Sequence, residues 1–533
     1  MSDSSIDEFQ RQIDQRIIAH DEASRALRRQ RNAIVPPIAR LLPELLCRVF
    51  EYFREFYQYH FGYLTDIQWI RITHVSSKWR ETALACPSLW NDIQMQFGPT
   101  WVQEMLIRSK GAPLSFTGII NDDNIPTIER LSQHTGRLHA LSLTSRSPAH
   151  SVHLANLMAD TTAPFMIALV IAFDLPRALS GALLLGPTPN SCLRRMALRN
   201  CILPWDQFRP MHSLTTLRIS FTFPLEAIPS VSQIVAILRQ TPLLTALVLK
   251  RALLGVPDQS VIPPAQRTVN LMHLEELHIE SDIAECCALL NHLTFPPLTR
   301  FVIDCSVPLA PQNPLRLLIP SLKYWSDLLR DQDDIDLRII EMTTAFELDH
   351  ELVLQLSPAV VAPFLLDLRL RIEDEDVGDQ FFADFETVLG VLPLENVCDL
   401  HIHDLPAESP LSESLHFFMH MRKLETIHVR GNDAINRVMT SLFSRIPIGE
   451  NGNEWNDPRD VLVSLPYSYP ALSYLEIWGY HFGDGEIALL YNALQLRRQM
   501  QQGLDYLYLR ACNFTPGNQT DILQHVVHEL IVD

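Results

Sequence analysis

The clearest alternation of apolar and polar residues lies between residues 42 and 53, where it has the period of an α-helix. Apolar residues recur three and four positions apart and would share one face: Leu42, Leu45, Leu46, Val49, Phe50 and Phe53. Pro43 suits the first turn of such a helix, where no backbone N–H is needed, and Glu44 complements the helix dipole. The pattern therefore predicts an amphipathic helix that begins near residue 42.

A second helical pattern follows about thirty residues later and ends at Cys86-Pro87, because a residue before proline is biased away from helix. Its apolar face consists of Ile72, Val75, Trp79 and Ala83, and Leu89 and Trp90 come just after it. Short helices with this much apolar surface cannot bury it all among themselves. We therefore expect the groove of a partner to cover part of it.

Residues 5–33 predict a more weakly amphipathic helix, with Ile6, Phe9, Ile13, Ile17 and Leu27 at helical spacing. Two interpretations stay open. The helix either rests on the following domain or pairs with another copy as a short coiled coil.

From about residue 101 the pattern changes to a repeat, L-x-x-L-x-[LIV]. Eleven copies begin at Leu138, Leu193, Leu214, Leu244, Leu274, Leu298, Leu365, Val397, Leu424, Leu472 and Leu504, and residues 165–170 form a weaker one. Leucine-rich repeats recur every 20–29 residues, and most of the spacings here are of that size or slightly longer. The repeat predicts short strands with leucines inward, stacked as a curved parallel sheet in an α/β solenoid.

Two stretches interrupt the repeat. The gap at residues 299–364 is expected to hold one or two degraded repeats, for example around S-L-K-Y-W-S-D-L, and residues 431–470 read as a long polar loop. The predicted organisation is a helix over residues 1–35, a helical module over 36–95 and a repeat domain over 96–533.

Residues 30–116 carry a resemblance to a known family. The order V-P-P-I-A-R-L-L-P-E-L-L, W-I-R-I-T-H-V-S-S-K-W-R-E-T-A-L and C-P-S-L-W resembles fungal F-box proteins of the basidiomycete type, which carry degenerate leucine-rich repeats. The resemblance departs from the family at Ser76, where Cys is frequent, and at residues 54–71, which are longer and more aromatic than usual.

This resemblance implies an F-box at residues 36–95 that docks on the Skp adaptor and, through it, on a cullin scaffold. The chain would be the substrate receptor of an SCF-type ubiquitin ligase and would not itself be an enzyme. By position, the residues implied in adaptor binding are Leu42, Pro43, Leu46, Val49, Trp79, Leu89 and Trp90. The alternative from the residues is a leucine-rich scaffold without a ligase role.

Composition restricts the cellular compartment and the class of binding partner that we expect. The start M-S-D-S-S-I-D-E lacks a secretory signal, and the nine cysteines include no C-x-x-C pair, so we expect a reducing, cytoplasmic or nuclear location. The longest apolar run, residues 165–173, is too short for a membrane span. The net charge of −19 opposes nucleic-acid binding. It serves either solubility or a basic protein target.

The sequence predicts no catalytic residues, metal site or cofactor. It lacks G-x-x-x-x-G-K-[ST], G-x-G-x-x-G and G-x-S-x-G, which makes a hydrolase the weakest of the alternatives. His401 and His403 would face the same side of a strand, but two histidines alone are a poor metal site.

The last two repeats place large polar and aromatic residues at outward positions, where earlier repeats have Thr216, Arg218, Ala246 and Val248. These candidates for target binding are Tyr474, Glu476, Trp478, Tyr506, Tyr508 and Arg510. Tyr, Trp and Arg dominate binding hot spots. Either this surface binds the target, or a C-terminal cap or the 431–470 loop covers it.

Overall fold

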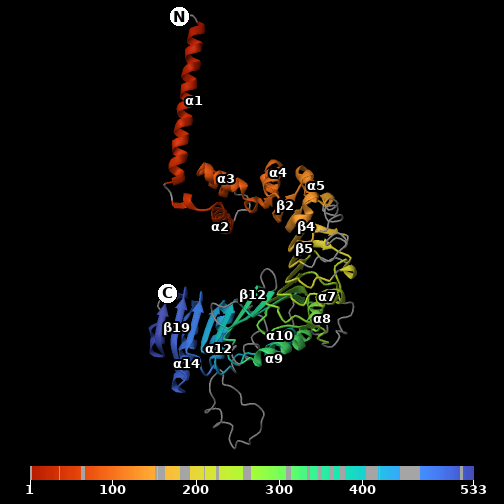
Figure 1. The fold of residues 1–533 in the computed structure, drawn as a ribbon. Coiled ribbons are helices and arrows are strands. Elements are labelled where there is room, and N and C mark those ends of the chain that lie inside the picture. The colour runs from red at the N-terminus through yellow and green to blue at the C-terminus, as the bar shows by residue number, and fades with distance from the viewer. Residues whose placement is uncertain are drawn as a thin grey trace, which may run out of the picture. The chain divides into compact units, whose positions relative to one another are not determined.

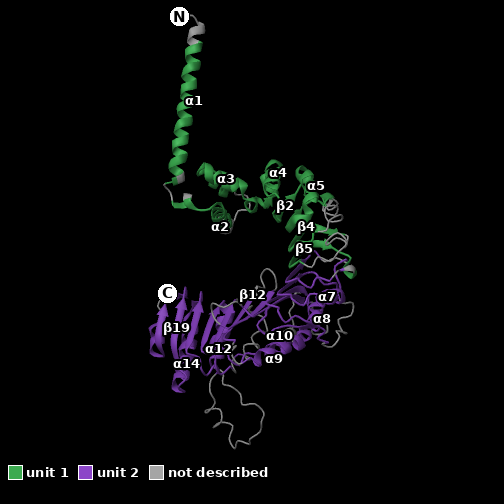
Figure 2. Ribbon diagram, viewed as in Figure 1, with its two compact units in different colours: residues 1–207 green, residues 208–533 purple. Residues whose placement is uncertain are grey.

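The chain forms two compact units, residues 1–207 and 208–533 (Figures 1 and 2). The computed structural model describes residues 3–34, 37–61, 67–150, 153, 163–179, 192–208, 210–223, 227–255, 266–307, 314–332, 337–345, 351–358, 364–372, 379–403, 418, 421–443, 468–515 and 520–533. The fold is α/β, with a helical N-terminal region and a mostly parallel sheet.

The first unit begins with helices and continues into parallel strands. Its α-helices are α1 (Asp3–Ile34), α2 (Pro43–Phe61), α3 (Ser77–Ala85), α4 (Pro99–Arg108) and α5 (Ile125–Leu131). Its 3-10 turns are η1 (Pro37–Arg40), η2 (Gln68–His74), η3 (Pro87–Trp90), η4 (Met95–Phe97), η5 (Asp122–Asn124), η6 (Ser132–Arg137), η7 (Pro148–His150) and η9 (Trp205–Gln207). Five strands pair in parallel in chain order: β1 (Asp92–Gln94), β2 (Leu114–Ile120), β3 (Leu138–Ser145), β4 (Ala168–Ala178) and β5 (Arg195–Ile202).

Local sequence explains where the helices of this unit start and stop. Helix α2 begins at Pro43, as predicted. The Ser76 hydroxyl accepts a hydrogen bond from the backbone N–H of Trp79 at 3.2 Å and so caps α3. The second predicted helix is therefore two elements, η2 and α3, and α3 ends at Ala85, before Cys86-Pro87. The aromatic stretch at 54–71 is partly helical, because α2 continues to Phe61.

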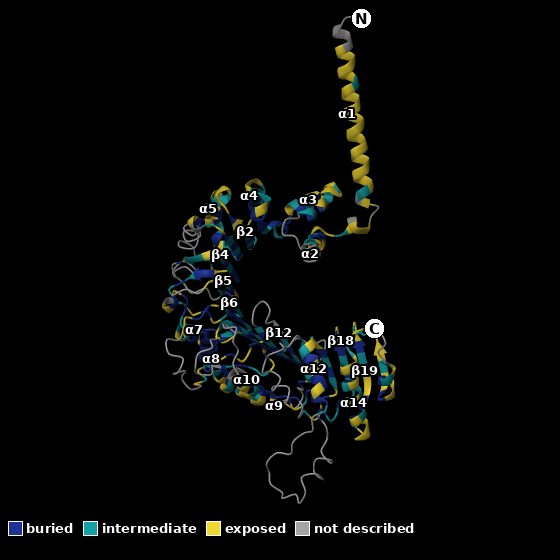
Figure 3. Ribbon diagram, turned by 180° about the vertical axis from the view of Figure 1, so that it is seen from behind, coloured by how far each residue is buried: buried dark blue, intermediate teal, exposed yellow. Residues whose placement is uncertain are grey.

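Helix α1 lies apart from the packed part of its unit. Every described side chain from Asp7 to Ile34 is exposed, except the half-buried Ile13 and Asn32 (Figure 3). Whether this helix rests on the following domain or pairs with another copy stays a prediction.

The second unit is built on a long sheet. Its strands are β6 (Thr216–Ser220), β7 (Ala246–Lys250), β9 (Glu276–Asp282), β11 (Arg300–Val307), β12 (Ile339–Ala345), β13 (Glu351–Ser357), β14 (Leu366–Ile372), β15 (Asp399–His403), β16 (Thr426–Arg430), β17 (Tyr474–Trp478), β19 (Leu504–Arg510) and β21 (Val527–Val532). Two small parallel pairs lie beside it, β8 (Val269–Asn270) with β10 (Leu293–Thr294), and β18 (His481–Phe482) with β20 (Asn513–Phe514).

The order of strands in this sheet reverses once. The spatial order is β6-β7-β9-β11-β14-β13-β12-β15-β16-β17-β19-β21, and β13 runs antiparallel to both of its neighbours. The other pairs are parallel. The prediction that the segment S-L-K-Y-W-S-D-L, within residues 299–364, is a degraded repeat strand is therefore wrong. The segment S-L-K-Y-W-S-D-L is helical, and the strands that follow it form an antiparallel meander.

Helices lie along one face of the sheet of the second unit (Figure 1). They are α7 (Val231–Leu238), α8 (Ile283–Leu290), α9 (Ile319–Arg330), α10 (Asp379–Val391), α12 (Asn432–Ser441) and α14 (Asp484–Gln499), with η10 (Pro314–Leu318) and η11 (Thr520–His525). Helix α12 corrects the predicted polar loop at 431–470: its apolar side, including Ile435 and Val438, is buried. Residues 444–467 of that predicted loop lie outside the described residues.

The core follows the repeat. A strand begins at, or shortly after, the first residue of each of the eleven repeat copies. Within β9, for example, Leu277 and Ile279 are fully buried, whereas the alternate residues His278 and Glu280 are half-buried on the opposite face. Leu298 departs from the pattern and is exposed. Among the described residues, no helix is long and apolar enough to cross a membrane.

Candidate functional site

Helix α2 carries one continuous apolar face, of which one edge is buried and the rest is exposed. Leu46 and Phe50 form the inner stripe and are buried. The outer stripe adjoins the inner one, and the two are centred about 80° apart on the helix at 100° per residue. The outer stripe consists of Leu42, Leu45, Val49, Phe53 and Phe56, all exposed. Leu42 is 64 % exposed and Val49 is 41 % exposed. One sequence run thus supplies both a core and a free surface.

An aromatic cluster holds the inner stripe. The rings of Phe50 and Trp79 lie 5.0 Å apart between centroids, and those of Trp69 and Trp90 lie 5.3 Å apart. The Trp90 indole N–H donates to the carbonyl of Ala83 at 2.8 Å. The guanidinium of Arg108, from α4, lies 4.4 Å from the centre of the Trp90 ring. Trp90 therefore joins the helical part of this unit to the elements that follow it.

Arg54 fixes the turn after α3, a role that the sequence did not suggest. One terminal nitrogen of its guanidinium donates to the carbonyls of Ser88 and Leu89 at 2.9 and 3.1 Å, and to the side-chain oxygen of Asn91 at 3.2 Å. Arg54 follows Phe50 by four residues, so it lies on the inner side of α2. A cation at a core-facing helical position was the only signal that could have revealed it.

The seven residues implied in adaptor binding divide into three groups. Leu42, Pro43 and Val49 are exposed at the start and on the outer stripe of α2. Trp79 is half-buried against Phe50. The third group is buried and consists of Leu46, Leu89 and Trp90. These side chains pack beneath the exposed surface and are not part of it.

The six residues predicted for target binding do lie together on one face of the sheet. Tyr474, Glu476 and Trp478 of β17 pair with Tyr506, Tyr508 and Arg510 of β19, in that order. The residues between them point to the core: Leu475, Ile477, Leu507 and Leu509 are fully buried. Trp478 is 39 % exposed and Tyr506 is 41 % exposed. Two aromatic rings on adjacent strands thus face outward.

Two arginines flank Trp478. The guanidinium carbons of Arg430, from β16, and Arg510 each lie 5.0 Å from the centre of the indole ring. Arg510 also approaches the carboxylate of Glu476 at 3.6 Å. Arg430 was not predicted from the sequence, although its position in the preceding repeat matches that of Trp478.

Three histidines continue this surface onto β15 and β16. The rings of His401 and His428 lie 4.4 Å apart, and those of His401 and His403 lie 6.5 Å apart. His428 contacts the carboxylate of Glu476 at 2.6 Å. Burial, together with the neighbouring His428 and His403, lowers the pKa of His401 to about 4. His401 is therefore neutral at physiological pH.

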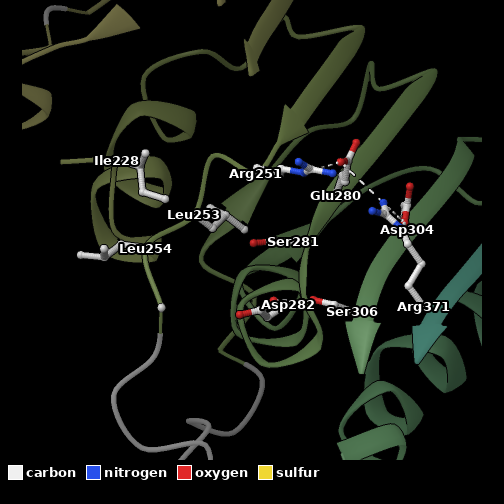
Figure 4. Close-up of a pocket in the computed structure, with 11 residues that line it drawn as sticks. Ile228, Arg251, Leu253, Leu254, Glu280, Ser281, Asp282, Asp304, Ser306 and Arg371 are labelled. Carbon is white, nitrogen blue, oxygen red and sulfur yellow. Dashed lines mark hydrogen bonds and ion pairs between the residues drawn. The ribbon is translucent and has the colours of Figure 1, made fainter. Parts of the chain in front are cut away.

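A hollow of about 570 Å³ lies at the carboxyl ends of β9, β11 and β14 (Figure 4). Its charges are paired within the hollow. Arg251 binds Glu280 at 3.0 Å, and Arg371 binds Asp304 through its Nε at 2.9 Å. Ser306 donates to Asp282. The described lining contains no histidine or cysteine.

Metal ligands do not gather in the described part of the chain: no three His, Cys, Asp or Glu side chains there are placed to hold an ion. The two surfaces described above, the outer stripe of α2 and the aromatic face of β17 and β19, are therefore the candidate sites. Both have the chemistry of protein contacts. A comparison with protein-family models finds no match to this chain, and a comparison with curated proteins finds none either.

Proposed function

We propose that this chain is the substrate-receptor subunit of an SCF-type ubiquitin ligase. In this proposal, residues 36–95 act as an F-box that docks on the Skp adaptor, and the remainder is a leucine-rich-repeat-like solenoid that presents a target protein. The outer stripe of α2 is the observation that carries the proposal, because it is a helical row of large apolar side chains left exposed.

The arrangement of α2 suits docking into a groove. Helix-in-groove recognition uses apolar anchors at i, i+3, i+4 and i+7. Leu42, Leu45, Val49 and Phe53 have such spacing. The inner stripe, the Arg54 hydrogen bonds and the Trp90 contacts hold the helix from the other side. The anchors are therefore preorganised, which lowers the entropic cost of binding.

Co-purification of the full chain with the Skp adaptor tests this half of the proposal. Replacing Leu45 and Val49 by lysine should abolish binding, because each buried anchor is worth about 2 kcal/mol or more. Both positions are exposed, so the thermal unfolding of the variant should match that of wild type. The matched control is Ile107→Lys, which changes an apolar residue on α4 that is at least as exposed as Leu45 and Val49. If the double variant binds as well as wild type, the docking surface is not α2.

We further propose that the aromatic face of β17 and β19 contacts the target. Trp478 and Tyr506 provide exposed aromatic area, and Arg430 and Arg510 provide donors beside it. Such residues are the usual content of binding hot spots. The acidic excess of the whole chain adds long-range attraction for a basic target, so added salt should weaken binding.

Affinity capture by the ligase-deficient Leu45→Lys/Val49→Lys chain tests the target face. Adding Trp478→Ala and Tyr508→Ala should remove the main captured protein, whereas adding Phe165→Ala, an exposed aromatic in the first unit, should not. Equal recovery with and without the first pair of changes would eliminate this face. Failure of adaptor binding together with successful capture would instead support the alternative of a leucine-rich scaffold.

A further inference from the structure

Helix α1 leaves an apolar row without a partner. Phe9, Ile13, Ile17, Leu27 and Ile34 fall within an arc of about 100° on the helix, at 100° per residue. Phe9, Ile17, Leu27 and Ile34 are exposed, and Ile13 is half-buried. Helix α1 contacts η1 at its end, and its length otherwise lies open (Figures 1 and 3).

The charges of α1 are separated along its length. Residues 3–18 carry four acidic and two basic side chains, a net charge of −2. Residues 19–34 carry two acidic and four basic side chains, a net charge of +2. The helix dipole favours this polarity only in the first and last turns. The separation extends further, because Asp14 and Arg25 lie well inside the helix.

We propose that α1 pairs with α1 of a second copy of this chain, in antiparallel orientation. An antiparallel pair sets the acidic half of each helix against the basic half of the other, and a parallel pair would set like charges together. Phe9 of one helix then meets Leu27 of the other, since the two lie at nearly equal distances from the middle of the helix. A second copy of α1 is thus the partner that fits both the charge separation and the apolar row of this helix.

Sedimentation equilibrium of the full chain over a concentration series tests the pairing. Wild type should reach about twice the monomer mass of 60.9 kDa. The Ile17→Asp/Leu27→Asp variant should remain a monomer, because it places charge in the covered row. The matched control is Ile18→Asp, which changes a residue that is 58 % exposed but lies on the opposite side of α1, and it should still dimerise. Far-ultraviolet circular dichroism should show that the rest of the fold is unchanged in all three.

Hydrogen exchange of α1 gives an independent reading of the same pairing. Peptides covering residues 7–34 should exchange slowly in wild type and in Ile18→Asp, and quickly in Ile17→Asp/Leu27→Asp. A monomeric wild type with freely exchanging α1 amides would overturn the proposal. Loss of the dimer in Ile18→Asp as well would also overturn it, because the apolar row would then not be the contact.

Charge reversal tests the orientation. Asp7→Arg/Glu8→Arg turns the acidic half basic, so an antiparallel pair becomes repulsive and its dissociation constant should rise about tenfold. In a parallel pair the two changed halves would repel each other before and after the substitution, so the dissociation constant would stay about the same. An unchanged dissociation constant would therefore exclude the antiparallel arrangement. The control is an equimolar mixture with the Arg28→Glu/Arg29→Glu variant. One helix is then basic and the other acidic, so tight pairing should return if interhelical charge is the cause.

Discussion

Replacing Trp90 by alanine should destabilise the first unit, and it should weaken the proposed adaptor binding only as a consequence. The side chain is 1 % exposed, and its removal deletes the ring contact with Trp69, the hydrogen bond to Ala83 and the stacking of Arg108. Deleting a buried Trp side chain typically costs about 3–5 kcal/mol. That is a large part of the roughly 5–15 kcal/mol by which a domain is stable.

Hydrogen exchange measured on peptides covering residues 68–108 is the appropriate assay, because a chain of two units need not unfold in one step. A loss of 3–5 kcal/mol should speed exchange there by about a hundred- to a few thousand-fold. Trp90→Phe keeps a ring and loses one hydrogen bond, about 1 kcal/mol, so it should retain adaptor binding. If Trp90→Ala abolished adaptor binding with no change in exchange, Trp90 would be a contact residue and the reasoning would be refuted.

Three further predictions concern the sheets. Leu277→Asp places a charge at a fully buried position of β9, which should cost several kcal/mol, and urea titration should show early unfolding of the second unit. Because the folded state holds His401 neutral, the unfolded chain binds more protons as pH falls from 6.5 towards about 4. The second unit should lose stability over that window, and His401→Gln should reduce the loss seen in denaturation midpoints. Gly118→Ala would bring a methyl group within 2.5 Å of Met95 and cost about 1–3 kcal/mol, lowering the melting temperature of the first unit, whereas Gly111→Ala meets open space and should not.

The repeat strands could be predicted because the L-x-x-L-x-[LIV] motif contains the strand period itself. Alternate apolar residues must share a face, and in β17 Leu475 and Ile477 are buried while Trp478 is exposed. The same alternation located the aromatic face. It does not show the direction of a strand or its pairing partner: Leu354 and Leu356 of the antiparallel β13 flank the polar Gln355, as the leucines of a parallel strand would.

The exposed apolar surface of α2, which we propose as the docking surface, was only partly predictable from the sequence. The spacing of residues 42–53 showed one apolar face, but Leu45 and Leu46 are neighbours in sequence and lie about 100° apart on the helix. Which of them is buried depends on what packs against α2, and that is decided by the Phe50–Trp79 contact and by Arg54. These tertiary contacts join α2 to residues more than twenty positions away, so no local pattern contains them.

The reversed order of β12, β13 and β14 has a consequence for how the second unit acquires its structure. From β6 to β11, and again from β15 to β19, each strand pairs with the next long strand along the chain, so these stacks can grow by short steps. Phe301 of β11, however, pairs with Leu366 of β14, which requires a long loop to close first. Because non-local pairing slows folding, we expect the two stacks to become protected early in pulse-labelled hydrogen exchange and the meander between them to become protected last. The antiparallel strand β13 is then the point at which two independently growing halves become one cooperative sheet.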